Sequence, residues 1–282
     1  MSVKILCDSS ADLSIEEIKE MDLLYVPIPV IFGEDTYLEG TNIDKDKFYE
    51  MLASNPAFPT TSQPSPASFL DYFEDAKENG DEIIAIIIPE ALSGTLQNVN
   101  LAKNMSGYNN IHIVDGCTIA AALRILIETA VKLRNEGKSA TEIVDTLNNL
   151  KKRTKIYAAL DTLENLYRGG RLTKAAAGIG EFANLKPVVT LDETGKVNIA
   201  HKSIGKNKAI SHIVKHFSEL SIDHSYPVYF IYSNLTENME VLRSKMIAAQ
   251  MDMSHNKACN LGPVLGTHVG TGAFGLAYVV KE

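Results

Sequence analysis

The chain has 282 residues, of which 45% are hydrophobic and 22% are charged, with 18 glycines and no tryptophan. This composition is ordinary for a globular chain of one or two domains. The formal net charge of −8 and the lack of a long basic run argue against nucleic acid or an anionic membrane surface as a partner.

The first half of the chain alternates apolar runs with amphipathic segments. Pro27 and Pro29 restrict the apolar stretch around them to an edge or irregular strand at 23–32. Ser65 or Ser68 is expected to cap the helix predicted at 69–79. Apolar runs predict strands at 3–7, 83–88 and 111–114, and helical spacing predicts helices at 14–21, 47–53, 69–79, 95–104, 118–136 and 141–153.

The order of elements changes near residue 155. The second half is expected to hold helices within 163–184 and a turn at 192–196. Further strands are predicted at 156–160, 188–191, 197–201, 228–232 and 276–280, and further helices at 208–220 and 237–251. We therefore expect an α/β protein of two domains, with a mostly parallel, helix-flanked sheet in residues 1–154 and a second α/β domain in residues 155–282.

Polar clusters follow the predicted strands at several joints. Ser93 lies just beyond the buried strand at 83–88, where a helix begins, and such joints hold ligands in α/β sheets. Three comparable clusters are Asp-Ser-Ser at 8–10, Thr-Thr-Ser-Gln-Pro at 60–64 and Gly-Thr-His-Val-Gly at 266–270. Together they predict a pocket with few charges and many hydroxyls.

Other motifs are better explained without catalysis or a cofactor. Asp8 lacks the second acid two residues on that a phosphatase of the aspartyl-phosphate type needs, so we expect it to order its own turn. His212 and His216 have metal-compatible spacing, but a solvated helix face explains them better. The dinucleotide-like glycine patterns at 178–183 and 270–275 lack the strand-to-helix context of that fold. No cofactor and no metal site are predicted.

The cysteines favour a reducing compartment, and the hydropathy favours a protein without a membrane span. Cys7, Cys117 and Cys259 are odd in number, far apart and set among apolar neighbours, so they are expected to be buried free thiols. No segment has the roughly 18 apolar residues that would span a bilayer, and the start is too short in apolar residues for a signal peptide. We expect a cytoplasmic protein without an integral membrane segment.

The motifs and their order resemble the DegV family over nearly the whole chain. The matching segments are Asp-Ser-Ser-Ala-Asp-Leu at 8–13, Thr-Ser-Gln-Pro-Ser at 61–65, Leu-Ser-Gly-Thr at 92–95, Gly-Gly-Arg-Leu at 169–172, Leu-Lys-Pro at 185–187 and Gly-Thr-His-Val-Gly-Thr-Gly-Ala at 266–273. The resemblance implies a long-chain fatty acid buried between two α/β domains, the second a mixed sandwich. It also implies a bacterial, non-catalytic, lipid-binding role as the fatty-acid-binding subunit of a fatty acid kinase.

Carried over by position, the resemblance makes Thr61, Ser93 and His268 the partners of the fatty acid carboxylate, with Ser62, Gly94 and Thr95 close by. Hydroxyls, a backbone N–H and a helix N-terminus would bind the carboxylate without a fixed cation. The local sequence alone leaves open whether His268 meets a ligand or satisfies a turn. Arg171 is expected to face a partner or to cap a helix.

Two positions depart from the family pattern. Ile204 stands where members commonly have an arginine, and Gly116 stands where a serine or threonine is usual. Two alternatives stay open beside the kinase-coupled carrier, and the departure at Ile204 favours the second of them. One is a Ser93-dependent hydrolase or acyltransferase with His268 as base, and the other is a binder of another small amphipathic anion without a kinase partner.

Overall fold

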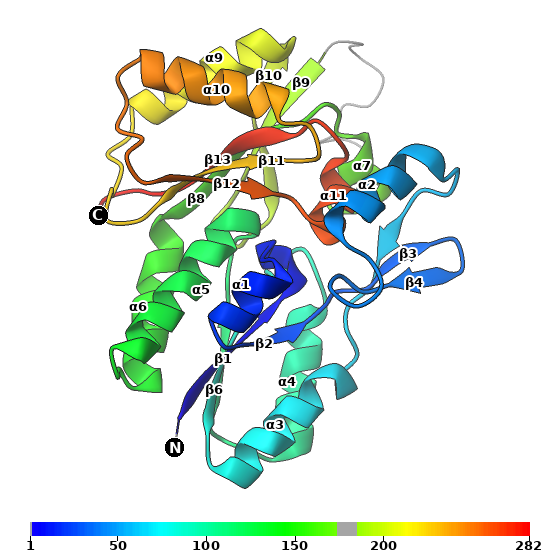
Figure 1. The fold of residues 1–282 in the computed structure, drawn as a ribbon, viewed down its shortest axis with the longest axis vertical. Helices are drawn as coiled ribbons and strands as arrows, with labels where there is room; N and C mark the ends of the chain where they lie inside the picture. Colours follow the sequence, from blue (N-terminus) through cyan, green and yellow to red (C-terminus); the bar gives the residue numbers. More distant parts are fainter. Residues whose placement is uncertain (1, 174–184) are drawn as a thin grey trace.

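Three β-sheets form the framework of the computed structural model, which describes residues 2–173 and 185–282 (Figure 1). The first sheet is parallel, with strand order β2-β1-β6-β7. Its strands are β1 (Val3–Asp8), β2 (Leu23–Val26), β6 (Glu82–Ile87) and β7 (Ile111–Asp115). These strands are nearly continuous apolar runs, as expected for a sheet that is buried on both faces.

The second large sheet is mixed, with strand order β10-β9-β8-β13-β11-β12. Only β11 and β12 pair in parallel within it. Its strands are β8 (Thr154–Ala159), β9 (Leu185–Leu191), β10 (Val197–Ile204), β11 (Val228–Tyr232), β12 (Asn256–Asn260) and β13 (Phe274–Val279). The predicted fold class, a parallel N-terminal sheet followed by a mixed C-terminal α/β part, is confirmed. The boundary between residues 154 and 155 stays a prediction.

A small antiparallel sheet with strand order β4-β3-β5 lies beside these two. Its strands are β3 (Val30–Phe32), β4 (Asp35–Tyr37) and β5 (Thr60–Thr61). The stretch expected as one irregular strand at 23–32 is therefore divided between two sheets, because Pro27 and Pro29 interrupt it. The small sheet matters for the site, since β5 carries Thr61.

Helix α5 (Ala120–Asn135) is the layer between the two large sheets. It contacts β1 and β6 on one side and β8, β11 and β13 on the other. α9 (Lys206–Ser218) and α10 (Glu237–Ala248) cover the outer face of the mixed sheet (Figure 1). The other helices are α1 (Ile15–Glu20), α2 (Lys45–Ser54), α3 (Ala67–Asn79), α4 (Thr95–Ser106), α6 (Ala140–Arg153), α7 (Glu164–Arg168) and α11 (Pro263–Val269), with a short 3₁₀ turn, η1 (Ser9–Ala11).

Asp8 orders its own turn, as predicted. Its carboxylate accepts hydrogen bonds from the Ser10 backbone N–H at 2.9 Å and from the Ile88 N–H at 2.8 Å. The expected serine cap of α3 is wrong. Pro66 occupies the cap position with no side-chain hydrogen bond, and the Ser65 and Ser68 hydroxyls bond to each other at 3.1 Å.

Two further expectations are corrected by the packing. His212 and His216 are half-buried rather than fully solvated: His216 stacks on the Tyr157 ring with centroids 4.0 Å apart, and the Tyr157 hydroxyl lies 2.8 Å from His212 Nε2. All three cysteines are free thiols, but Cys117 is only half-buried, whereas Cys7 and Cys259 are buried. The glycine pattern at 178–183 lies outside the described residues.

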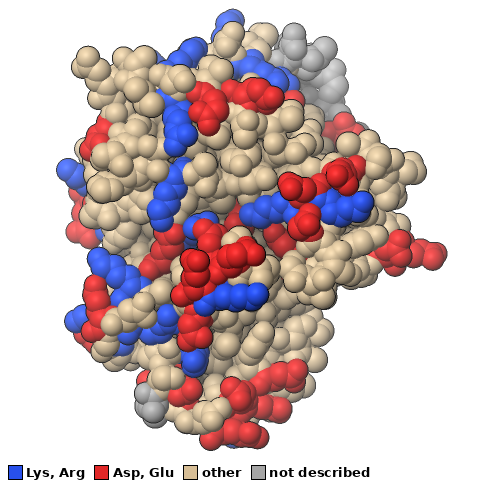
Figure 2. All heavy atoms as spheres, in the orientation of Figure 1, with Lys and Arg blue, Asp and Glu red and all other residues tan. Residues whose placement is uncertain are grey.

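The surface charges, the hydropathy of the helices and the placement of metal-ligating side chains bear on three other expectations. Acidic and basic side chains are interspersed on the face shown in Figure 2. Among residues 2–173 and 185–282, no helix is both long and apolar enough to cross a bilayer. The same ranges contain no cluster of three or more His, Cys, Asp or Glu side chains placed to hold a metal ion.

Candidate functional site

Thr61 and His268 meet although 207 residues separate them in the sequence. Thr61 is on β5 and His268 is in the last turn of α11, and a hydrogen bond of 2.9 Å joins Thr61 Oγ1 to His268 Nε2. The other ring nitrogen, Nδ1, is buried and has no partner within the described residues. The fold thus brings together the predicted polar clusters at 60–64 and 266–270.

Ser93 lies between β6 and α4, as the sequence predicted. Its hydroxyl is 2.8 Å from the Thr95 hydroxyl, and it accepts a hydrogen bond of 3.3 Å from the Thr95 N–H. Gly94 is the N-cap of α4, and a Cβ there would lie 2.0 Å from Gln63 Oε1. The Gln63 side chain would have to shift to admit a larger residue here. A hydrogen bond of 2.8 Å from Asn98 Nδ2 to the Pro64 carbonyl joins α4 to the 61–64 segment.

One cavity brings Thr61, Ser93 and His268 together. Arg171 also lines it, and the remaining lining residues are apolar: Ile28, Ile88, Leu92, Ile119, Leu166, Val197, Val264, Leu265 and Val269. We call this compartment the head compartment. Ser62 and Gly94 are adjacent in sequence to lining residues and Thr95 is two positions from Ser93, but none of the three lines the compartment.

The Asp-Ser-Ser cluster at 8–10 does not contribute to the head compartment. Its side chains are buried in local structure, where the Ser9 hydroxyl accepts a hydrogen bond of 2.9 Å from the Ile28 N–H and the Ser10 hydroxyl donates to Asp8. Three of the four predicted polar clusters therefore meet at the cavity, and the fourth stabilises the end of β1.

Arg171 is the functional candidate that the sequence did not place. The expected site has no fixed cation, whereas this arginine lines the head compartment. It is held there by a hydrogen bond of 3.0 Å from Arg171 Nε to the Leu92 carbonyl, and it also donates to the Gly169 carbonyl. Only the Gly-Gly turn before it hinted at an unusual position.

His268 is neutral in this setting. It is 9% exposed, and burial, reinforced by the positive charge of Arg171, lowers its pKa to about 3. The head compartment thus combines one cation with a neutral imidazole and two hydroxyls, and no carboxylate of the described chain lines it. Such a set of groups binds one monovalent anion.

An apolar compartment, which we call the tail compartment, lies directly beside the head compartment. Ile119, Leu166, Val197, Leu265 and Val269 line both. The tail compartment is further lined by residues of α5, β8, β9 and β11 and by residues just beyond β8 and β12 or just before β13: Ala120, Ile156, Ala158, Leu160, Val189, Thr190, Leu191, Ile231, Leu261 and Ala273. The open spaces are narrow, about 40 Å³ and 60 Å³.

The geometry does not form a serine hydrolase pair. His268 Nε2 bonds to Thr61, whereas the Ser93 hydroxyl bonds to Thr95. A nucleophilic serine needs a base within hydrogen-bond reach, and no histidine of the described chain has that contact with Ser93. The arrangement is suited to holding an amphipathic anion, with polar groups at one end of a long apolar cavity.

Comparisons with known proteins agree in family and fold. A family model described as "Uncharacterised protein, DegV family" matches residues 2–281. A DegV domain-containing protein of Caldanaerobacter subterraneus is 30% identical over 280 residues, covering 99% of both chains. A fatty-acid-binding DegV family protein from Thermus thermophilus superposes with a TM-score of 0.88 at 30% identity, covering 99% of this chain and 100% of that one.

A more distant structure shows the same fold. It is the fatty acid kinase B3 protein of Streptococcus pneumoniae loaded with linoleic acid, with a TM-score of 0.85 at 21% identity and full coverage, 100%, of both chains. The match of the family model over almost every residue is sufficient for assignment. This chain belongs to the DegV family.

Proposed function

We propose that this protein is a non-catalytic carrier of one long-chain fatty acid. The observation that carries the proposal is that a polar head compartment adjoins an apolar tail compartment, with five lining residues in common: Ile119, Leu166, Val197, Leu265 and Val269. The relative from Thermus thermophilus is itself a fatty-acid-binding protein of 30% identity. The tail compartment then holds the acyl chain and the head compartment holds the carboxylate.

The head group is bound by charge and hydrogen bonds together. The Ser93 and Thr61 hydroxyls and neutral His268 supply the hydrogen bonds, and Arg171 supplies the positive charge. Hydrogen bonds to a carboxylate are worth about 1.5–3 kcal/mol each, because one partner is ionised. These contacts offset the cost of moving the carboxylate out of water.

The tail supplies most of the affinity. Each buried CH₂ contributes about 0.8 kcal/mol, so ten methylenes give roughly 8 kcal/mol before the costs of association. The tail compartment is narrow, and the chain must move apolar side chains outward to enter. The empty cavity and the loaded cavity therefore differ in side-chain packing.

The carrier presents the carboxylate to a separate ATP-binding kinase subunit, which phosphorylates it to an acyl phosphate. This step is supported by the family resemblance, while the likeness to the Streptococcus pneumoniae kinase protein bears on fold alone. The exposed side chain of Ile204, 59% accessible, occupies the position where family members commonly have an arginine. If the kinase subunit encoded in the same genome co-purifies with the protein, the kinase-coupled role is supported. If it does not, a carrier without a kinase partner is favoured.

Loss of head-group contacts is expected to weaken binding. Ser93→Ala and His268→Ala each remove a polar partner of the carboxylate, so we expect roughly a tenfold to hundredfold increase in Kd for palmitic acid. Mass spectrometry of lipids extracted from natively purified protein measures the cargo, and calorimetric titration measures Kd. Ser218→Ala, on the exposed side of α9, is the control. An unchanged Kd in both site variants would contradict the proposal.

The carrier is expected to be inert towards activated esters. Because no base contacts Ser93, purified protein should hydrolyse p-nitrophenyl esters no faster than the Ser93→Ala variant does. The measurement is the release of nitrophenolate at several pH values. Turnover that requires Ser93 would instead support the hydrolase alternative.

A further inference from the structure

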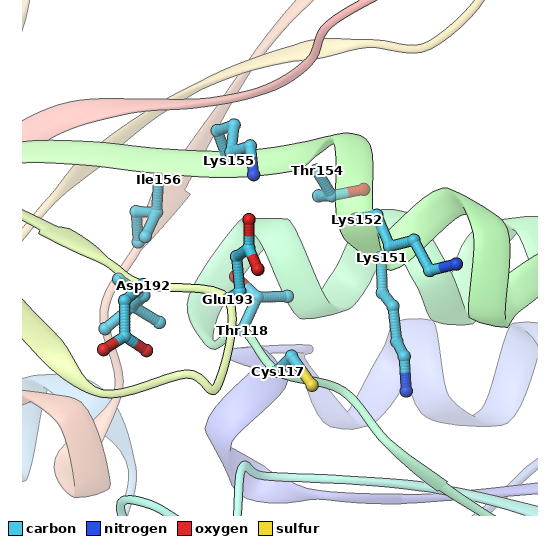
Figure 3. A pocket seen from close by; sticks show the side chains of 10 residues that line it. Cys117, Thr118, Lys151, Lys152, Thr154, Lys155, Ile156, Asp192 and Glu193 are labelled. Carbon is cyan, nitrogen blue, oxygen red and sulfur yellow. The ribbon is translucent and has the colours of Figure 1, made fainter. Parts of the chain in front are cut away.

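A second, polar pocket opens beside the tail compartment (Figure 3). We call it the far pocket, and it has about 300 Å³ of open space. It is built from the loop before α5, the end of α6, the start of β8 and the turn between β9 and β10. Its lining residues are Cys117, Thr118, Lys151, Lys152, Thr154, Lys155, Ile156, Leu191, Asp192 and Glu193.

Only a thin apolar wall separates the far pocket from the tail compartment. Ile156 of β8 and Leu191 of β9 line both cavities. The far pocket shares no residue with the head compartment. A chain that starts at Ser93 and fills the tail compartment therefore meets the far pocket when it passes these two side chains.

Two polar groups of the far pocket lack partners in the described chain. Thr118 is 2% exposed, and its hydroxyl makes no hydrogen bond there. Lys155 is half-buried, and among residues 2–173 and 185–282 its ammonium has no ion pair or hydrogen bond. In Figure 3 the Lys155 side chain turns into the pocket above Glu193 and Thr118. A buried hydroxyl that stays unpaired is costly, so an oxygen that reaches Thr118 would be stabilised there.

The other charged groups of the far pocket are either occupied or exposed. Lys151 donates a hydrogen bond of 2.9 Å to the Asp115 carbonyl. The Asp192 carboxylate accepts from the N–H and hydroxyl of Thr194 and from the Lys196 N–H, within its own turn. Lys152 and Glu193 are exposed, and the Glu193 carboxylate points toward Lys155 without forming an ion pair with it (Figure 3). Thr118 and Lys155 are therefore the groups left to meet a ligand.

We propose that the far pocket receives the oxygen-bearing ω end of a long-chain fatty acid, either a hydroxyl or a second carboxylate. This inference rests on the proposed function, because the first carboxylate must lie in the head compartment. A terminal methyl group cannot satisfy the Thr118 hydroxyl. A terminal oxygen accepts from that hydroxyl and from the Lys155 ammonium, once Ile156 and Leu191 move apart to admit the chain.

The test compares three acids of equal chain length: palmitic acid, ω-hydroxypalmitic acid and the corresponding α,ω-dicarboxylic acid. Calorimetric titration should give a Kd about tenfold lower for each oxygenated acid than for palmitic acid. Thr118→Val should abolish both preferences, and Lys155→Met should weaken mainly the dicarboxylic acid. Palmitic acid should bind both variants as it binds the wild type, and Lys208→Met, on exposed α9, should change nothing.

The outcomes separate this inference from the function on which it rests. Palmitic acid binding without any preference for the oxygenated acids overturns the far-pocket inference and leaves the carrier intact. A preference that survives in both variants overturns it as well. Failure of all three acids to bind the wild type overturns the carrier, and the inference with it. Thr118→Val exchanges a hydroxyl for a methyl of similar size, so its melting temperature without ligand should not fall. That measurement checks that the variant is folded.

Discussion

Ala158→Leu should nearly abolish fatty acid binding while leaving the protein folded. Ala158 is 6% exposed on β8, and its side chain lines the tail compartment. That compartment has about 60 Å³ of open space, which the three added carbons of leucine would fill. If four methylenes lose their place, about 3 kcal/mol is lost, or roughly a hundredfold in Kd.

Calorimetric titration with palmitic acid measures this loss, and thermal unfolding checks the fold. Filling an apolar space does not remove existing contacts, so the melting temperature without ligand should stay level or rise. Ala200→Leu is the matched control, because Ala200 is exposed on β10 of the same sheet. Undiminished binding by Ala158→Leu, with the control also unchanged, would show that the acyl chain lies elsewhere.

The sequence predicted most of the framework because its buried strands are strongly apolar. β11 (Val228–Tyr232) has the predicted bounds, and the parallel N-terminal sheet follows from runs such as the one at 83–88. β12 (Asn256–Asn260) was missed, because this edge strand is mostly polar and shows no apolar alternation. Edge strands are held by pairing with a neighbour, and a local sequence does not reveal that neighbour.

The surroundings of His268 show a different limit. Glycines at 266 and 270 suggested a turn, but the segment is helix α11, which begins at Pro263. Gly266 lies inside this helix. The position needs glycine because a Cβ there would lie 2.5 Å from the Phe48 ring of α2. The glycine is thus a packing requirement between distant segments. Thr61 and His268 could be proposed as partners only from the family resemblance, since their contact spans 207 positions.

Arg171 illustrates why charge at a site is hard to predict. The Gly-Gly-Arg turn is visible in the sequence, but the direction of the side chain depends on its hydrogen bond to the Leu92 carbonyl, 79 residues away. The far pocket could not be predicted from the sequence for the same reason. Thr118 and Lys155 are unremarkable in sequence, and only the packing of the two large sheets around α5 brings them to one space.

Two buried carboxyl groups converge on Gly262 at the start of α11. Asp12 is 2% exposed and Glu39 is 5% exposed. A Cβ at Gly262 would lie 2.7 Å from Glu39 Oε1 and 3.1 Å from Asp12 Oδ1. Asp12 Oδ2 and Glu39 Oε2 have no hydrogen-bond partner in the described chain. The nearby cation is Lys45 of α2, whose ammonium donates to the Asp12 carbonyl at 2.8 Å and to the Asn260 carbonyl at 2.9 Å.

Burial raises both carboxyl pKa values, and one lysine does not compensate for it. The pKa of Asp12 rises to about 7 and that of Glu39 to about 8, although Lys45 lowers both. The folded protein therefore binds more protons here than the unfolded chain does, and this contribution to stability falls as pH rises through 7 to 8. His212, His216 and His268 have lowered pKa values, so their contribution has the opposite sign, and it acts mainly below pH 6.5.

Lys45→Met should destabilise the protein by an amount that grows with pH. At pH 5.5 both carboxyl groups are protonated, and the loss is that of two hydrogen bonds, about 1–2 kcal/mol. At pH 8.5 the variant must either keep its protons or bury charge without a cation, so we expect about 3 kcal/mol. Urea unfolding at both pH values measures the difference, and Lys47→Met, exposed on the same helix, is the control.

Glu39→Gln separates the charge effect from the loss of the lysine's packing. Glu39→Gln replaces one buried carboxyl group with an amide. In the Lys45→Met background it should therefore recover most of the additional loss in the free energy of unfolding at pH 8.5, and little at pH 5.5. A loss that is equal at both pH values, and is not recovered by Glu39→Gln, would mean that Lys45 acts only through its two carbonyl contacts. Since those carbonyls belong to Asp12 and Asn260, 248 residues apart, either result measures how strongly Lys45 joins the segment after β1 to the end of β12.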